Sequence, residues 1–213
     1  MTRPVTIGGI DAPDSELTRK AASLVERVHS QSMLHHVHRT WWFAEFLGRK
    51  RGLKYDRELV YLSSVMHDLG LTEEFNAEDR FEVDGADAAR RFLKESGYAD
   101  SKAQQVWEAI ALHSSLGVAD KLAPETCLVC LGAHVDVFGI NIEEITPSLI
   151  DETIGRYPRL GFKNAFQQAI AEVAKKKPQF AVGTGLADVG RRHVHGFACA
   201  NLCDLIDGAP FDS

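Results

Sequence analysis

The stretch that decides the fold is residues 56–70, DRELVYLSSVMHDLG. It begins with aspartate, a residue type that caps helices, carries an acidic residue in its first turn, and closes on a glycine. Between these ends apolar residues recur three and four positions apart, which predicts a helix. Its last turn holds the adjacent pair His67-Asp68. A helix C-terminus can point such side chains into a cleft, so the pair marks a candidate site.

Helical periodicity continues on both sides of this stretch, and hardly any segment alternates as a strand would. We therefore predict an all-α bundle that forms a single domain over residues 1–213, with its core at about 30–140. The expected helices cover residues 14–29, 34–50, 56–70, 83–97, 101–115, 124–138, 146–157 and 161–177. Within the C-terminal part, 141–213, we expect a loop after Pro178 that wraps the bundle, then a short helix at 199–206.

Composition narrows the range of partners. The formal charge of -6 over 213 residues includes no long run of one sign, so there is no electrostatic footprint for nucleic acid or an anionic membrane. No stretch approaches the ~20 apolar residues that span a bilayer, and the N-terminal segment lacks the apolar core of a signal peptide. We expect a cytoplasmic protein that acts on a small-molecule substrate and binds neither nucleic acid nor membrane. Whether the protein forms a homo-oligomer stays open.

Four cysteines admit two interpretations. Cys127 and Cys130 have the two-residue gap of a zinc pair, and Cys199 with Cys203 would complete four ligands. The first two, however, lie in the apolar run CLVCLGAHVDVFG, where free cysteine behaves as a small buried hydrophobic residue. We favour core packing over a structural zinc site.

The neighbours of the nine histidines are more informative than their number. A histidine stands 31 positions before His67, and an aspartate stands 68 positions after Asp68. Imidazoles and carboxylates suit zinc, iron, manganese or cobalt, and two of each leave positions open for water or substrate. This set predicts one catalytic divalent metal ion, and Zn²⁺, Fe²⁺, Mn²⁺ and Co²⁺ all stay open at this point.

The ordered set resembles the HD superfamily of metal-dependent hydrolases from the second to the sixth predicted helix. In that superfamily the opening histidine stands three residues before an arginine, which selects His36 in His36-Val-His-Arg39. VMHDLG supplies the pair, and the final ligand falls on Asp136 in LGAHVDVFG. The resemblance therefore implies an HD-domain helical bundle whose metal ligands are His36, His67, Asp68 and Asp136.

Two departures from the wider superfamily narrow the function. Many phosphohydrolase members continue the pair as HDIGK, with a lysine that meets phosphate, whereas this chain has HDLGL with Leu71 in that place. Members with two metals carry a histidine four residues before a Gly-Ala, and the matching residue here is Phe81. We expect no second metal, although His113 stands at a position similar to another ligand of the two-metal sites.

The run RFEVDGADAARRFL, followed by VWEAIALHSS, is similar to the cyanamide hydratase-like branch of the superfamily. That resemblance implies a mononuclear zinc enzyme that adds water across the carbon–nitrogen triple bond of cyanamide to give urea. The ion would lower the pKa of its water to about 7. We assign the proton transfer to His113 and the orientation of the water to Asp68, which is also a second candidate for the relay. Phe43, Phe75 and Phe81 are expected to wall a small dry pocket.

Other interpretations stay open at this point. One is a phosphohydrolase acting on nucleotides or other phosphate esters, and another is a regulatory or metal-storage module without activity. His35 and His38 are interpreted as surface residues or as supports of the metal ligands. His193 and His195 in RRHVHG are interpreted as part of a basic surface loop.

Overall fold

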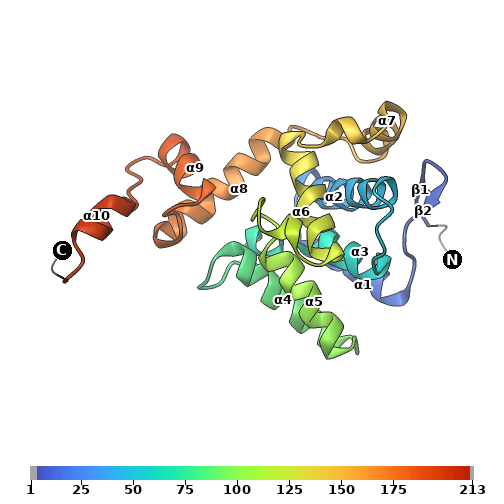
Figure 1. Ribbon diagram of the computed structural model, residues 1–213, viewed down its shortest axis with the longest axis horizontal. Helices are drawn as coiled ribbons and strands as arrows, with labels where there is room; N and C mark the ends of the chain where they lie inside the picture. The colour runs from blue at the N-terminus through green and yellow to red at the C-terminus, as the bar shows by residue number, and fades with distance from the viewer. Residues whose placement is uncertain (1–3, 212–213) are drawn as a thin grey trace. The chain divides into compact units, whose positions relative to one another are not determined.

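The computed structural model describes residues 4–211, and helices make up most of it (Figure 1). The all-α prediction is therefore confirmed. The α-helices of the described residues are α1 (Glu16–Val28), α2 (Gln31–Lys50), α3 (Arg57–Met66), α4 (Phe81–Glu95), α5 (Asp100–Ala111), α6 (Pro124–Phe138), α7 (Pro147–Arg156), α8 (Phe162–Lys176), α9 (Gly185–His193) and α10 (Leu202–Asp207). Short 3-10 helices are η1 (Leu69–Leu71), η2 (Ala119–Lys121), η3 (Ile142–Glu144) and η4 (Pro178–Phe180).

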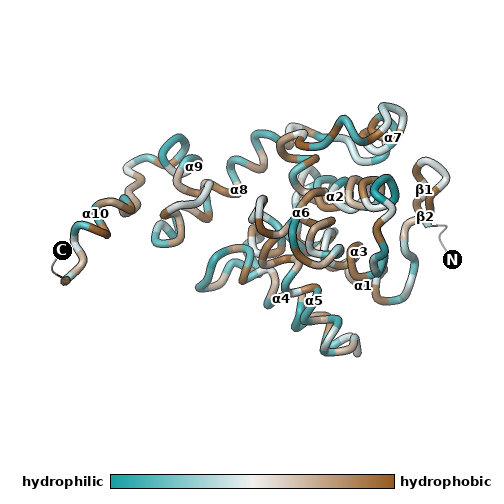
Figure 2. The backbone as a smooth tube through the Cα atoms, in the orientation of Figure 1, coloured by the Kyte–Doolittle hydropathy of each residue, from teal (hydrophilic) through white to brown (hydrophobic). Residues whose placement is uncertain are grey.

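The chain divides into two compact units, one ending at Phe162 and one beginning at Lys163. The predicted single domain over the whole chain stays a prediction. In the first unit α2, α3 and α6 supply most of the core, and their apolar segments appear brown in Figure 2. Trp41 and Trp42 are both only 1% exposed, with their rings edge to face, so both tryptophans fill the core.

Side-chain caps begin α1 and α3, whereas α2 begins at Gln31, three residues before its predicted start, without a side-chain cap hydrogen bond. Ser15 Oγ accepts a hydrogen bond from the Thr18 backbone N–H at 3.1 Å and begins α1. Asp56 Oδ1 accepts from the N–H groups of Glu58 and Leu59 and begins α3. The third helix ends earlier than predicted, at Met66 instead of Gly70, so His67 becomes its C-terminal cap and Asp68 precedes η1.

A glycine brings α6 against α2. A Cβ atom added at Gly132 would lie 2.3 Å from the Thr40 carbonyl oxygen, a separation that real Cβ atoms do not show. Only glycine therefore permits this helix–helix approach. Since Asp136 follows one turn later on α6, the approach places its carboxylate beside His36 on α2.

A second close approach holds the segment after the His-Asp pair. A Cβ atom at Gly70 would lie 1.9 Å from the Phe81 carbonyl oxygen, and a Cβ atom at Gly85 would lie 2.9 Å from the Gly70 nitrogen. The η1 backbone thus rests on the first turns of α4 with no side chain between them. This contact fixes the path of the chain just beyond His67 and Asp68.

The prediction of a continuous loop after Pro178 was wrong, because residues 185–193 form α9. Thr184 Oγ1 caps this helix by accepting from the Leu186 N–H at 3.3 Å. Gly190 lies inside this helix, although glycine favours helix ends. A side chain at this position would collide with the Phe197 ring, which lies 2.5 Å from an added Cβ atom. The short C-terminal helix is confirmed as α10. A small hairpin of β1 (Thr6–Ile7) and β2 (Ile10–Asp11) was not predicted.

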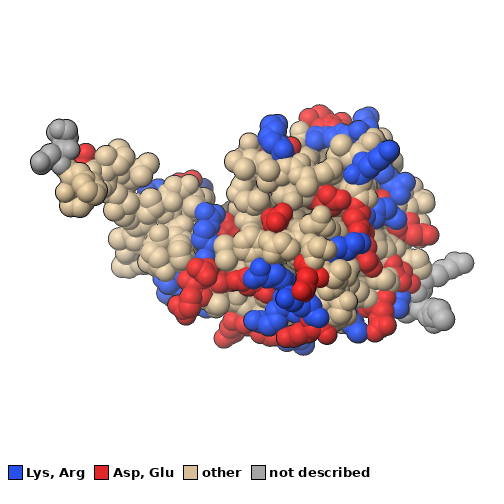
Figure 3. Space-filling model, turned by 60° about the horizontal axis from the view of Figure 1, so that its bottom comes forward, with Lys and Arg blue, Asp and Glu red and all other residues tan. Residues whose placement is uncertain are grey.

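The surface carries both signs of charge. On the face drawn in Figure 3, Lys and Arg side chains lie among Asp and Glu side chains over the first unit. Within residues 4–211, no helix combines the length and the apolar character needed to cross a membrane.

Candidate metal centre

Three of the predicted ligands meet in the buried interior of the first unit. His36 comes from α2, and His67 with Asp68 comes from the end of α3. All three are at most 1% exposed, and one potential ligand atom of each lies within 4.8 Å of the others. Asp68 Oδ2 lies 3.3 Å from His36 Nε2 and 3.2 Å from His67 Nε2. We call this set the His-His-Asp cluster; it has the geometry and the chemistry to hold a metal ion.

Backbone and side-chain oxygens orient the imidazoles of the cluster. His67 Nδ1 lies 2.7 Å from the carbonyl oxygen of Ser64, one turn earlier on α3. Since a carbonyl only accepts hydrogen bonds, Nδ1 donates its proton to Ser64, which turns Nε2 toward Asp68. His36 is held by the Asp136 carboxylate, whose Oδ2 lies 2.7 Å from Nδ1, and by the Phe162 ring, stacked at 4.6 Å.

His113, the predicted proton relay, lies beside the cluster. It follows the C-terminus of α5 and is 5% exposed, and its Nδ1 lies 2.7 Å from the Ile110 carbonyl oxygen. Its Nε2 therefore has the lone pair, 3.7 Å from Asp68 Oδ1. The Phe81 ring lies edge-on at 5.8 Å and closes the apolar side. Burial, helped by the charge of His67, lowers the pKa of His113 to about 4.

Asp136, the fourth predicted ligand, is not brought into the cluster. It is 3% exposed, and both of its oxygens face nitrogen donors. Oδ1 accepts from Arg39 Nε at 2.7 Å and from Arg159 Nη1 at 2.9 Å. Oδ2 accepts from Arg39 Nη2 at 2.8 Å and faces His36 Nδ1. In this structure Asp136 lies behind His36, on the side opposite to Asp68.

The carboxylates remain ionised although they are buried. Burial raises the pKa of Asp136, but the hydrogen bonds from His36 and Arg39 outweigh it and hold that pKa well below its ordinary range. Burial likewise raises the pKa of Asp68, and the neighbouring His67 and His36 outweigh it. Two buried anions therefore flank the His36 ring, an environment that suits a cation.

Sequence reasoning missed several residues of the site. Arg39 served only to select the histidine three positions earlier, yet it is fully buried and makes a bidentate pair with Asp136. No sequence pattern pointed to Arg159, which donates to the same carboxylate. Glu82, 2% exposed, accepts from Ser114 Oγ at 2.7 Å and so ties the start of α4 to the residue after His113. The His36-x-x-Arg39 spacing, which places both side chains on one helix face, was the available signal for the first of these.

The remaining candidate residues are not members of the His-His-Asp cluster. Phe43 is 2% exposed in the core and Phe75 packs partly buried against it, so Phe81 is the predicted wall whose ring contacts His113. Cys127 and Cys130 are buried free thiols, as core packing requires, and in the described part of the chain the only histidine, cysteine or carboxylate group fit for a metal is the His-His-Asp cluster. His193 and His195 are exposed in the second unit.

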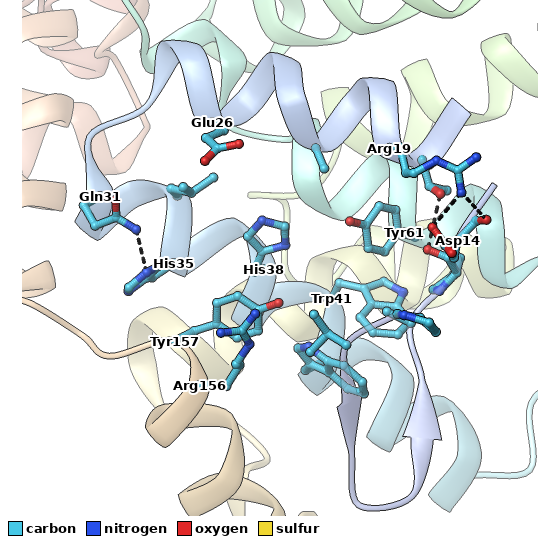
Figure 4. A pocket seen from close by; sticks show the side chains of 18 residues that line it. Asp14, Arg19, Glu26, Gln31, His35, His38, Trp41, Tyr61, Arg156 and Tyr157 are labelled. Atoms are coloured by element: carbon cyan, nitrogen blue, oxygen red, sulfur yellow. Dashed lines mark hydrogen bonds and ion pairs between the residues drawn. The ribbon is translucent and has the colours of Figure 1, made fainter. Parts of the chain in front are cut away.

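A separate cavity of about 380 Å³ lies on the other side of α2. Figure 4 shows His35, His38 and Trp41 of α2 projecting toward it, with Tyr157 opposite. His38 stacks on Tyr157 with ring centroids 5.0 Å apart, and burial, with the charges of His35 and Arg156, lowers the pKa of His38 to about 4. No member of the His-His-Asp cluster lines this cavity. It is therefore distinct from the candidate metal centre.

Comparison with known families agrees with this geometry. The model of the HD domain family matches residues 33–151, more than half of the chain, and this segment contains every residue of the cluster and His113. A search of curated proteins finds no match.

Proposed function

Because this chain belongs to the HD domain family, whose members are in general metal-dependent hydrolases, we propose that it is a mononuclear metal-dependent hydratase. Its substrate is cyanamide or a similar small nitrile or amide, and cyanamide gives urea. Zn²⁺ is the ion that we favour. The proposed ion is held by the His-His-Asp cluster, which the sequence extends with Asp136 as a fourth ligand.

The observation that carries the proposal is the combination of a buried cluster with an apolar wall at the start of α4. Phe81 stands where members with two metals have a histidine, and its ring lies against His113. Leu71, the last residue of η1, stands where many phosphohydrolase members have a phosphate-binding lysine. Arg39 and Arg159 donate to Asp136, the carboxylate that faces His36, and are thereby already paired. A compact, uncharged substrate suits these surroundings better than a phosphate ester.

When bound, a divalent ion supplies a more acidic water and a Lewis acid for a nitrile nitrogen. Asp68 would orient the attacking water, and His113, whose Nε2 lies 3.7 Å from Asp68 Oδ1, would transfer the proton, with Asp68 as the second candidate for the relay. One carbon–oxygen bond forms, the nitrile nitrogen gains the proton that the water loses, and the resulting isourea tautomerises to urea. Atoms balance without a second substrate. The burial of the cluster limits competing water.

The test is urea formation from cyanamide by zinc-loaded protein, measured beside phosphate release from a panel of nucleotides. His67→Ala removes one residue of the cluster. His134→Ala is the matched control, because His134 is also buried and also lies 2.7 Å from a backbone carbonyl, that of Cys130. We expect urea from the native protein and from the control but not from His67→Ala. Phosphate release without urea formation would replace the hydratase by the phosphohydrolase.

A further inference from the structure

We propose that the cavity on the other side of α2 binds a small uncharged aromatic heterocycle with hydrogen-bonding atoms on opposite edges, as a nucleobase has. The cavity is lined by α1, α2, α3, the end of α7 and the chain on either side of the β1–β2 hairpin, all in the first unit. No member of the His-His-Asp cluster lines it. The proposal therefore goes beyond the proposed function and does not depend on it.

The size and the wall of the cavity suit a flat ring. Its volume of about 380 Å³ falls within the range of about 300–1,000 Å³ that is typical of small-molecule pockets. Trp41 lies in the wall with its ring edge to face against Trp42 at 4.4 Å and against Tyr61 at 5.3 Å. Elsewhere in the wall His38 stacks on Tyr157. Because these rings hold one another, an aromatic surface is already in place for a ligand to pack against.

Two polar side chains of the wall have hydrogen-bonding capacity to spare. Tyr61 is only 7% exposed, and its hydroxyl makes no hydrogen bond to another residue among 4–211. The His38 imidazole makes none to the described residues either. Figure 4 shows the Tyr61 hydroxyl turned toward the side of the cavity where His38 lies. A hydroxyl and an uncharged imidazole both donate and accept, so the two groups can recognise polar atoms on two edges of one ring.

The charged groups of the cavity favour neither an anion nor a cation. Arg19 is already paired with Asp14 at 2.8 Å. The other charged side chains of the lining are one of each sign, Glu26 and Arg156, and both are exposed to solvent. An ion of either sign would meet one attracting and one repelling group. An uncharged ring gains from the aromatic wall without this cost, so the ligand is neutral.

The probes are adenine, which is uncharged at neutral pH and has polar atoms on several edges, and indole, a fused ring of similar size with one N–H donor. Ligand-observed saturation-transfer NMR measures the Kd of each. We expect a Kd of about 1 mM or below for adenine and binding about 5–10-fold weaker for indole. Benzoate and benzylamine, an anion and a cation, should also bind more weakly than adenine. A chelator should leave the Kd of adenine unchanged, because the cavity lies apart from the His-His-Asp cluster.

Two substitutions locate the site. Tyr61→Phe removes only the hydroxyl and should weaken adenine binding about 5–10-fold. Tyr98→Phe is the matched control, because the Tyr98 hydroxyl is also buried without a partner in the described part of the chain but does not line the cavity. Ala22→Leu fills the cavity from α1 and should abolish binding of adenine, whereas Ser23→Leu, at an exposed neighbouring position outside the cavity, should not.

Four results would overturn the proposal. One is the absence of adenine binding to the native protein at about 5 mM. The second is a Kd for adenine that neither Tyr61→Phe nor Ala22→Leu changes, and the third is binding of indole, benzoate or benzylamine as tight as that of adenine. The fourth is loss of adenine binding on chelation, which would assign adenine to the metal centre.

Discussion

Replacing Arg39 with methionine tests whether the ion pair behind His36 stabilises the site. The Arg39 side chain is fully buried and donates Nε and Nη2 to Asp136 at 2.7 and 2.8 Å. Its Nη1 also donates to the Tyr157 carbonyl at 3.0 Å. Methionine fills much of the same volume but donates none of these hydrogen bonds, so the change isolates the polar contribution.

The expected loss follows from the geometry. Removing one partner of a buried ion pair costs about 3–5 kcal/mol, because the other charge stays buried. Asp136 keeps two further partners, His36 Nδ1 and Arg159 Nη1, so we expect the lower end, about 3 kcal/mol in the free energy of unfolding. Since a loosened Asp136 orients His36 less well, metal affinity should also fall about 10-fold or more.

The assay is urea unfolding of metal-free protein in a double-mutant cycle of Arg39→Met and Asp136→Asn. We expect a coupling energy of about 2 kcal/mol between the two positions. Arg19→Met is the control, because Arg19 pairs with Asp14 at 2.8 Å and both side chains are exposed, 55% and 36%. That change should cost less than about 1 kcal/mol. A coupling energy below about 0.5 kcal/mol, or equal losses at the two arginines, would refute the reasoning.

Three more predictions concern packing, pH and metal removal. Gly70→Ala forces a Cβ to within 1.9 Å of the Phe81 carbonyl oxygen and should cost about 1–3 kcal/mol in urea unfolding. Gly155→Ala, which meets nothing within 4 Å, should stabilise by up to about 1 kcal/mol, and a reversed order would contradict the packing argument. The pKa of His38 is about 4 in the folded protein and 6.5 for an ordinary histidine, so the unfolded chain binds more protons between these values and stability falls as pH drops below 6.5. From pH 7 to 5 His38 should account for a loss of about 2 kcal/mol, and His38→Gln should remove that part of the slope and leave the part due to His29 and His113, whose pKa values burial also lowers to about 4. An unchanged slope in His38→Gln would contradict the prediction. Chelation should remove about 2.7 kcal/mol of stability relative to protein with free zinc at 100 times Kd, and His67→Ala should show no such difference in thermal unfolding.

Local signals predict the helices well because caps and periodicity act over a few residues. Ser15 and Asp56 begin their helices as predicted, since each satisfies N–H groups within three positions. Gly190 shows the limit of this reasoning. Judged from its neighbours in the sequence, Gly190 suggests that a helix ends there. The structure shows another reason for the glycine: the Phe197 ring, seven residues later, occupies the space of a side chain. Helix propensity does not reveal the packing between α9 and the Phe197 ring that follows it, so α9 was not predicted.

The candidate site was likewise predicted only in part. Order and spacing bring out His36, His67 and Asp68, because the pair is adjacent and the first histidine has its arginine three residues on. The place of Asp136 depends on which imidazole nitrogen it faces and on donors from two other segments, Arg39 and Arg159. Spacing along the chain contains neither fact. A carboxylate that lies inside the His-His-Asp cluster and one that pairs with the far nitrogen of a histidine therefore look alike in the sequence.

The contact between Gly70 and Gly85 involves backbone alone, the carbonyl oxygen of His67 included, and no side chain of the His-His-Asp cluster takes part in it. The curve of the chain after His67 and Asp68 is therefore formed by folding before an ion arrives. A receptor shaped in advance loses little conformational entropy when it is filled. Redesigned variants in which amides replace the imidazoles should keep the same concave backbone. The backbone around the site could therefore be redesigned to bind an uncharged ligand in place of a metal ion.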